Sequence, residues 1–166
     1  MNRHPGGEEH TVRLLRLAGL SAGSKILDMG AGDGSALLLM RQYGYAAVGI
    51  DLEPQSDLVQ KGDFLHTDYP DESFDGILSQ CAFFVSGDAS GAICEARRLL
   101  RPKGVLMLSD VFFSEPTLPG FRILHKEDMT PVWRAYYLET LWREETACEC
   151  LPRGKCRYLS IIAAAQ

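Results

Sequence analysis

Two aspartates and three glycines in the first third of the chain are the residues best suited to bind a ligand. Asp28 precedes Gly30, Gly32 and Gly34, and Asp51 follows further along. Glycines let the backbone approach a ligand without obstruction by side chains. One carboxylate at a strand end can accept hydrogen bonds from two ribose hydroxyls, and another can pair with a positively charged amino group. The pattern predicts a site for a nucleoside with an anionic or zwitterionic tail.

The spacing of these glycines separates two classes of nucleotide cofactor. A dinucleotide fingerprint has the form G-x-G-x-x-G, whereas this chain has G-x-G-x-G, with Ser35 at the place of the fingerprint's third glycine. An acid directly before the turn, here Asp28, also suits an amino group better than a negatively charged pyrophosphate. The spacing therefore disfavours an NAD(P)-dependent oxidoreductase.

Alternating strands and helices must position these residues. Apolar runs predict strands at 25–29, 46–51, 58–62, 74–79 and 105–110. Helical spacing of apolar residues predicts helices at 9–17, 34–43, 88–99 and 130–144. This order is typical of an α/β fold, a Rossmann-like three-layer sandwich with a mostly parallel sheet, whose ligands bind at the carboxyl ends of the strands.

Three connections depart from a regular alternation. Only residues 52–57 join the second and third strands, too few for a packed crossover helix, so we expect an extended crossover beside an edge strand, with that helix missing or reduced. Prolines and a glycine in 111–128 predict a long loop over the mouth of the cleft. Residues 146–151 and 156–163 are predicted to form an antiparallel hairpin that closes the sheet.

The composition indicates one globular domain. The chain has 166 residues, of which 46% are hydrophobic and 23% are charged. We divide it into a lead-in and helix at 1–24, a cofactor-binding core at 25–113, and a loop, helix and hairpin at 114–166. The net charge of -5 argues against a nucleic-acid partner, and no apolar run approaches the length of a membrane span. Without an export signal, the five cysteines indicate reduced thiols and a cytoplasmic location.

Several motifs between Lys25 and Phe113 resemble, in the right order, those of the class I S-adenosylmethionine-dependent methyltransferases. The similar segments are Ile26–Gly34, Val48–Asp51, Gly62–Phe64, Phe74–Asp75 and Leu99–Leu108. The first resembles the cofactor loop of that family and the second its ribose-binding strand end. The resemblance implies a methyltransferase domain with S-adenosylmethionine as its cofactor.

The resemblance also implies which residues bind this cofactor. They are Asp28, Gly30, Ala31, Gly32, Asp51, Leu52, Asp63, Phe64, Gln80 and Cys81. Asp28 and the glycine loop would hold the methionine moiety, and Asp51 would bind the ribose. Asp63 would accept a hydrogen bond from the adenine amino group, and Leu52 and Phe64 would enclose the adenine ring. Gln80 and Cys81 would line the cofactor near its sulfonium.

The implied activity is methyl transfer to a small-molecule acceptor, and the catalytic residues stay unassigned. In-line attack on a sulfonium methyl group needs positioning rather than a metal. If the acceptor needs a base, the candidates are Asp110, His125 and His10, none in a decisive context. An alternative is a catalytically silent cofactor-binding module that acts through a protein partner. The sheet face left short of cover either docks a second copy, which gives a homodimer, or leaves the adenine pocket open.

Two further groups of residues admit a functional and a structural interpretation. Cys148, Cys150 and Cys156 could bind a soft metal, but their spacing is not that of a zinc site, and burial of small apolar residues is favoured. The aromatic stripe that begins with Trp133 and Tyr137 could form a substrate wall, but such spacing on a helix favours packing.

Overall fold

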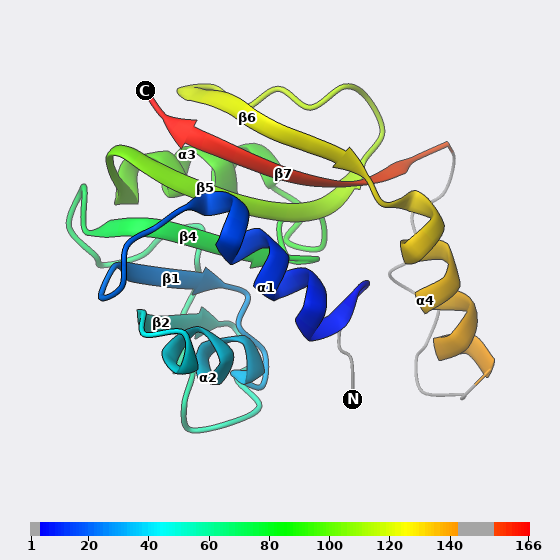
Figure 1. Ribbon diagram of the computed structural model, residues 1–166, viewed down its shortest axis with the longest axis horizontal. Helices are drawn as coiled ribbons and strands as arrows, with labels where there is room; N and C mark the ends of the chain where they lie inside the picture. Colours follow the sequence, from blue (N-terminus) through cyan, green and yellow to red (C-terminus); the bar gives the residue numbers. More distant parts are fainter. Residues whose placement is uncertain (1–3, 143–154) are drawn as a thin grey trace.

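The computed structural model describes residues 4–142 and 155–166, which form a seven-stranded sheet with helices on both faces (Figure 1). The strand order is β3-β2-β1-β4-β5-β7-β6. The strands are β1 Lys25–Met29, β2 Ala46–Asp51, β3 Gln60–Lys61, β4 Phe74–Gln80, β5 Leu100–Phe112, β6 Phe121–Asp128 and β7 Arg157–Ala165. The helices are α1 Gly7–Ala18, α2 Ser35–Gln42, α3 Ala89–Leu99 and α4 Thr130–Trp142.

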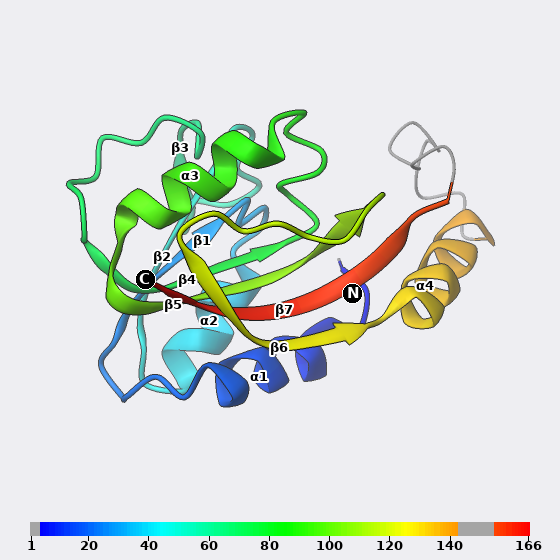
Figure 2. The ribbon, with the colours of Figure 1, turned by 90° about the horizontal axis from the view of Figure 1, so that it is seen from above.

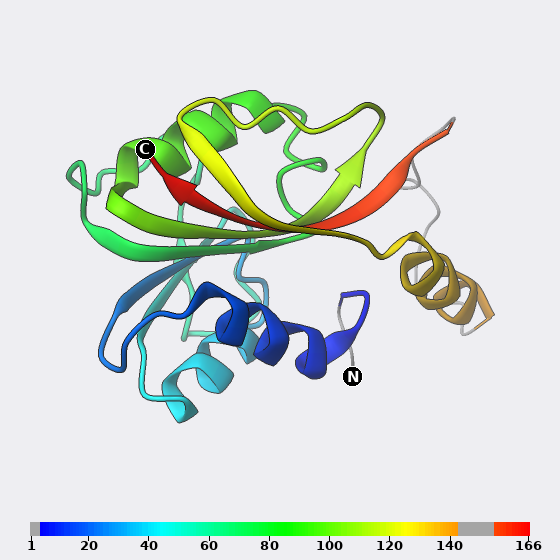
Figure 3. The same ribbon diagram turned by 45° about the horizontal axis from the view of Figure 1, so that its top comes forward.

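The molecule has the three layers that the sequence predicts. Helices α1 and α2 cover one face of the sheet and α3 covers the other (Figures 2 and 3). Side chains alternate between the faces along each strand. On β1, Ile26 packs in the core cluster under α1 and α2, whereas Leu27 packs in the cluster under α3. Helix α4 lies beyond the carboxyl end of the parallel strands (Figure 1).

Strand β3 follows β2 without an intervening helix, as the short connection predicts. It is only two residues long and pairs in parallel with the end of β2, through Ile50 with Gln60 and Asp51 with Lys61. Both of its residues are exposed, and it lies at one edge of the sheet. The homodimer expected from this edge stays a prediction, which light scattering at high protein concentration tests.

The prediction of one long loop at 111–128 is wrong. Strand β5 continues to Phe112, and β6 occupies Phe121–Asp128. Strand β7 is antiparallel to both β5 and β6, so the antiparallel closure of the sheet exists. The edge partner of β7 is β6, which precedes α4 in the chain, and it takes the place that the sequence analysis gave to 146–151. Those residues lie outside the described ranges. β6 escaped notice because it is an edge strand on which Phe121 and no other side chain is buried, so it lacks an apolar run.

Within the described part of the chain, no helix is long and apolar enough to cross a membrane.

Candidate cofactor-binding site

A cavity of about 390 Å³ lies where β1, β2 and β4 reach their carboxyl ends. It is lined by Gly30, Asp51, Leu52, Asp63, Phe64, Leu65, Gln80, Cys81, Ala82, Val85 and Ser86. Seven of the ten residues predicted to bind the cofactor are in this lining. Asp28, Ala31 and Gly32 are the three that are not. A wider hollow of about 640 Å³ borders the start of α4, and none of the predicted residues lines it.

The turn after β1 is tied to β2 through its backbone. The N–H groups of Gly30 and Ala31 donate to the carbonyl of Ile50 at 2.9 and 3.1 Å. Gly30 has a φ of +90°, and a Cβ at this position would collide with the Cβ of Ala82 in the turn after β4. Only glycine allows both the backbone conformation and this close approach. The turn after β1 therefore packs directly against Ala82 in the turn after β4, beside the cavity.

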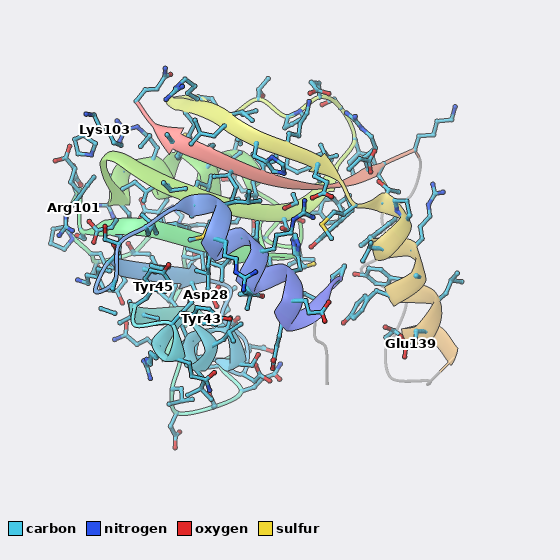
Figure 4. All side chains as sticks on the ribbon, in the orientation of Figure 1. Asp28, Tyr43, Tyr45, Arg101, Lys103 and Glu139 are labelled. Carbon is cyan, nitrogen blue, oxygen red and sulfur yellow. The ribbon has the colours of Figure 1, made fainter. Side chains whose placement is uncertain are left out.

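Asp28 is buried near the carboxyl end of β1, at 4% exposure, between Gly49 on β2 and Leu78 on β4. Burial, together with the smaller effect of the nearby charges of Asp51 and Asp33, raises the pKa of its carboxyl to about 7. Figure 4 shows Asp28 within the body of the molecule. A buried carboxyl of this kind is stabilised as a carboxylate when a cation comes close.

The carboxylate of Asp51 connects the end of β2 to the glycine turn. Its Oδ2 accepts a hydrogen bond from the N–H of Gly32 at 2.9 Å, and its Oδ1 accepts one from the N–H of Glu53 at 2.9 Å. A carboxylate has about four acceptor positions, so lone pairs remain on both oxygens for a ligand in the cavity. Asp51 thus binds Gly32, which places this glycine beside the cavity although it is not part of the lining.

The connections after β2 and β3 form another wall of the cavity. Asp63 accepts a hydrogen bond from the N–H of Leu65 at 2.8 Å through Oδ1. The neighbouring Phe64 is buried, with its ring centroid 5.8 Å from that of Phe83, whereas Leu52 is 56% exposed at the cavity. The acid and the two apolar side chains predicted to surround an adenine ring therefore lie in one wall.

The segment before β1 holds Gln80 at the end of β4, a contact that the sequence analysis missed. The hydroxyl of Thr11 donates to Gln80 Oε1 at 3.1 Å, and Gln80 Nε2 lies 3.3 Å from His4 Nδ1. His4 Nε2 lies 3.3 Å from the Thr11 hydroxyl, which completes a triangle. Burial lowers the pKa of His4. No spacing rule links residues of a lead-in segment to the end of a strand so far along the chain.

Cys81 is held in a backbone conformation with φ +62° beside the cavity. Its N–H donates to the carbonyl of Ser109 at 2.9 Å, and its Sγ lies 3.2 Å from the hydroxyl of Tyr158. Burial raises the pKa of the thiol to about 12. Cys81 is therefore a neutral thiol at physiological pH, the form of a cysteine that is a poor nucleophile.

None of the three candidate bases lines the cavity. Asp110 accepts hydrogen bonds from the N–H groups of Phe84 and Val111 at 3.0 and 2.8 Å, and burial raises its pKa to about 6. His10 Nε2 lies 2.8 Å from the hydroxyl of Ser109, and burial lowers its pKa to about 4, so the ring is neutral. His125 lies on β6 at the far edge of the sheet. Asp110 and His10 thus have structural partners.

The charged residues that line the cavity are acidic. Asp51 and Asp63 line the cavity, and Asp28 is buried near it. Arg101 and Lys103 lie at the opposite end of the sheet from α4, where the parallel strands begin (Figure 4). This distribution favours a ligand with positive charge.

Comparison with known proteins agrees with the geometry. A family described as a methyltransferase domain matches residues 27–108, about half of the chain. A demethylmenaquinone methyltransferase from Tropheryma whipplei (strain Twist) is 30% identical over 61% of this chain and 46% of its own length. A glycine/sarcosine/dimethylglycine N-methyltransferase from Actinopolyspora halophila is 30% identical over 80% of this chain and 26% of its own length.

The fold has a similar counterpart among solved structures. The crystal structure of the cyclase SpnF aligns with a TM-score of 0.76 and 18% identity, over 99% of this chain and 84% of the other. This likeness shows the fold alone. The chain spans less than half of the length of the two methyltransferases named above. The matched domain, the order of the motifs and the strand order together identify the chain as a member of the class I S-adenosylmethionine-dependent methyltransferases.

Proposed function

We propose that the protein transfers a methyl group from S-adenosylmethionine to a small-molecule acceptor. The observation that carries this proposal is the placement of Gly30, Asp51, Asp63 and Gln80, from four different connections, around one cavity with Asp28 buried nearby. The names of the two methyltransferases compared above, which refer to demethylmenaquinone and to glycine and its methylated derivatives, support an acceptor of small size.

The residues fit a cofactor that carries two positive charges, an ammonium and a sulfonium. Asp28 would pair with the ammonium, and the remaining lone pairs of Asp51 would accept from the ribose hydroxyls. Leu52 and Phe64 would enclose the adenine ring, with Asp63 at its amino group. The bound cofactor would supply an activated methyl group.

The residues of the chain would position the reacting groups and would not take part in the bond-making step themselves. Gln80 and Cys81, both held by hydrogen bonds to other elements, would fix the sulfonium end of the cavity. Fixed groups of this kind hold a reacting centre in line with its nucleophile and exclude water. We assign no general base.

A silent cofactor-binding module is the second candidate, favoured by the absence of the three candidate bases from the cavity lining. Many methyl acceptors have a lone pair available at neutral pH and need no base, so this observation does not outweigh the first proposal. A methyl-transfer screen over thiols, amines, hydroxy acids and quinols separates the two, since a silent module consumes no S-adenosylmethionine with any of them.

Isothermal titration calorimetry with S-adenosylmethionine, S-adenosylhomocysteine and NAD tests the cofactor. We expect both sulfur nucleosides to bind with one site per chain and NAD to show no heat of binding, because the G-x-G-x-G turn lacks the dinucleotide fingerprint. Binding of NAD alone would overturn the proposal.

A further inference from the structure

The residues between β2 and β3, 52–59, cross over the outside of the glycine turn, and we call them the strap. Two hydrogen bonds join the strap to the turn. The N–H of Gln55 donates to the carbonyl of Gly32 at 3.0 Å, and the hydroxyl of Ser56 donates to the carbonyl of Asp33 at 2.7 Å. The strap therefore occupies the place where a packed crossover helix is missing and contacts the predicted cofactor loop directly.

Gly34 packs closely against the strap. A Cβ at Gly34 would lie 3.2 Å from Leu58 Cβ and 3.2 Å from Val59 Cγ2, and 3.4 Å from the hydroxyl oxygen of Ser56. Gly34 also has a φ of +80°, a conformation that side chains disfavour. Val59 is buried and packs in the core cluster that includes Ala31, which anchors the far end of the strap. The third glycine of G-x-G-x-G thus makes room for the strap.

The strap complements the contacts that the turn makes with β2. Ile50 and Asp51 accept hydrogen bonds from N–H groups of the turn, whereas the strap donates to its carbonyls. The peptide unit is planar, so fixing the carbonyl of Gly32 also fixes the direction of the N–H of Asp33, which points away from the strap. Hydrogen bonds thus restrain the turn on both sides in the ligand-free structure.

We propose that Ser56 is a positioning residue for the cofactor loop, and that the strap preorganises this loop in place of the missing helix. The inference rests on the proposed function, because it assigns the loop to S-adenosylmethionine. Without the Ser56 hydroxyl, the turn samples other orientations, and binding must first select the competent one. The apparent dissociation constant then rises by the inverse of the competent fraction.

The test compares Ser56→Ala with Ser56→Thr and with a matched control. Ser73 also donates its hydroxyl to a backbone carbonyl, that of Pro70, but it lies before β4, at the opposite end of that strand from the cavity. Calorimetry with S-adenosylhomocysteine measures affinity, thermal unfolding without ligand measures stability, and hydrogen exchange measures protection of the backbone at 28–36. These three readouts separate positioning from general stability.

We expect Ser56→Ala to weaken binding by about fivefold to tenfold, the value of one lost hydrogen bond. Ser56→Thr, which keeps the hydroxyl, and Ser73→Ala should bind within about twofold of wild type. Ser56→Ala should also speed exchange at 28–36 while its melting temperature falls no further than that of Ser73→Ala. Wild-type affinity in Ser56→Ala, or equal losses in Ser56→Ala and Ser73→Ala, would overturn the inference. A wild-type protein that binds neither sulfur nucleoside would instead remove the proposed function and the inference with it.

Discussion

At the scale of single residues, the proposed pairing of Asp28 with the cofactor's ammonium predicts that binding depends on pH. The pKa of Asp28 is raised to about 7, mainly by burial, so below about pH 7 most ligand-free molecules hold a proton there, and pairing with an ammonium would release it. We expect the affinity for S-adenosylhomocysteine to fall by up to about tenfold for each pH unit below about 7 and to level off above it. Calorimetry across this range, in buffers with different ionisation enthalpies, measures both the affinity and the released proton.

Asp28→Asn is the control for this prediction. The substitution removes the titrating group, so binding should become weak and independent of pH between about 5 and 7. The pH dependence of the ligand-free protein's stability has the opposite sign to that of binding. A carboxyl with a raised folded-state pKa destabilises the fold increasingly as pH rises from its unfolded value of 3.8 to about 7, at most by about 4 kcal/mol. Ligand-free Asp28→Asn should therefore melt higher than wild type at pH 8. An unchanged pH profile of binding in Asp28→Asn would contradict this role.

The sequence predicts which residues meet at the cavity when those residues lie at the ends of strands. Asp51 and Gln80 end parallel strands, so the topology alone brings them together. Ser56 and Thr11 could not be predicted in the same way, because their hydroxyls act through contacts between loops whose paths no periodicity describes. The assignment of Asp51 and Gln80 to cofactor binding, and of Ser56 to positioning, stays a proposal.

At the scale of elements, Asp110 fixes the connection between β4 and α3, part of which lines the cavity. Its carboxylate accepts from the N–H groups of Phe84 and Val111, so Asp110→Ala leaves two backbone donors without this acceptor. We expect a loss of about 1–3 kcal/mol in the free energy of unfolding, measured by urea denaturation at pH 7. Asp110→Asn, which keeps one acceptor oxygen, should lose less. If both variants keep wild-type stability and lose methyl transfer, Asp110 is a base and its structural role is wrong.

The elements of the core were predictable and the far edge of the sheet was not. Strands β1 and β4 are largely buried on both faces, so they appear as apolar runs, and the missing crossover helix follows from a count of residues. Strand β6 instead exposes charged side chains such as Arg122 and Lys126. Prolines before it indicate a loop, and its pairing with β7 depends on residues far away in the sequence. Tertiary pairing decided the structure there.

At the scale of the whole molecule, the ligand should stabilise the fold because it would join connections from four parts of the sheet. Gly30, Asp51, Asp63 and Gln80 follow or end β1, β2, β3 and β4, and an unfolded chain does not bring them together. At S-adenosylhomocysteine concentrations about 100 times the dissociation constant, linkage gives about 2.7 kcal/mol, or a rise of about 5–10 °C in melting temperature for a domain of this size. Differential scanning calorimetry over a ligand series measures the rise.

The rise in melting temperature on ligand binding should depend on the protonation of Asp28. At a fixed ligand concentration the rise should be larger at pH 8 than at pH 6, because at pH 6 most Asp28 carboxyls are protonated and the affinity is lower. Asp28→Asn should abolish this difference while it raises the melting temperature of the ligand-free protein. If the melting temperature does not increase with ligand concentration, the ligand does not bind the folded state. The cavity would then need another occupant.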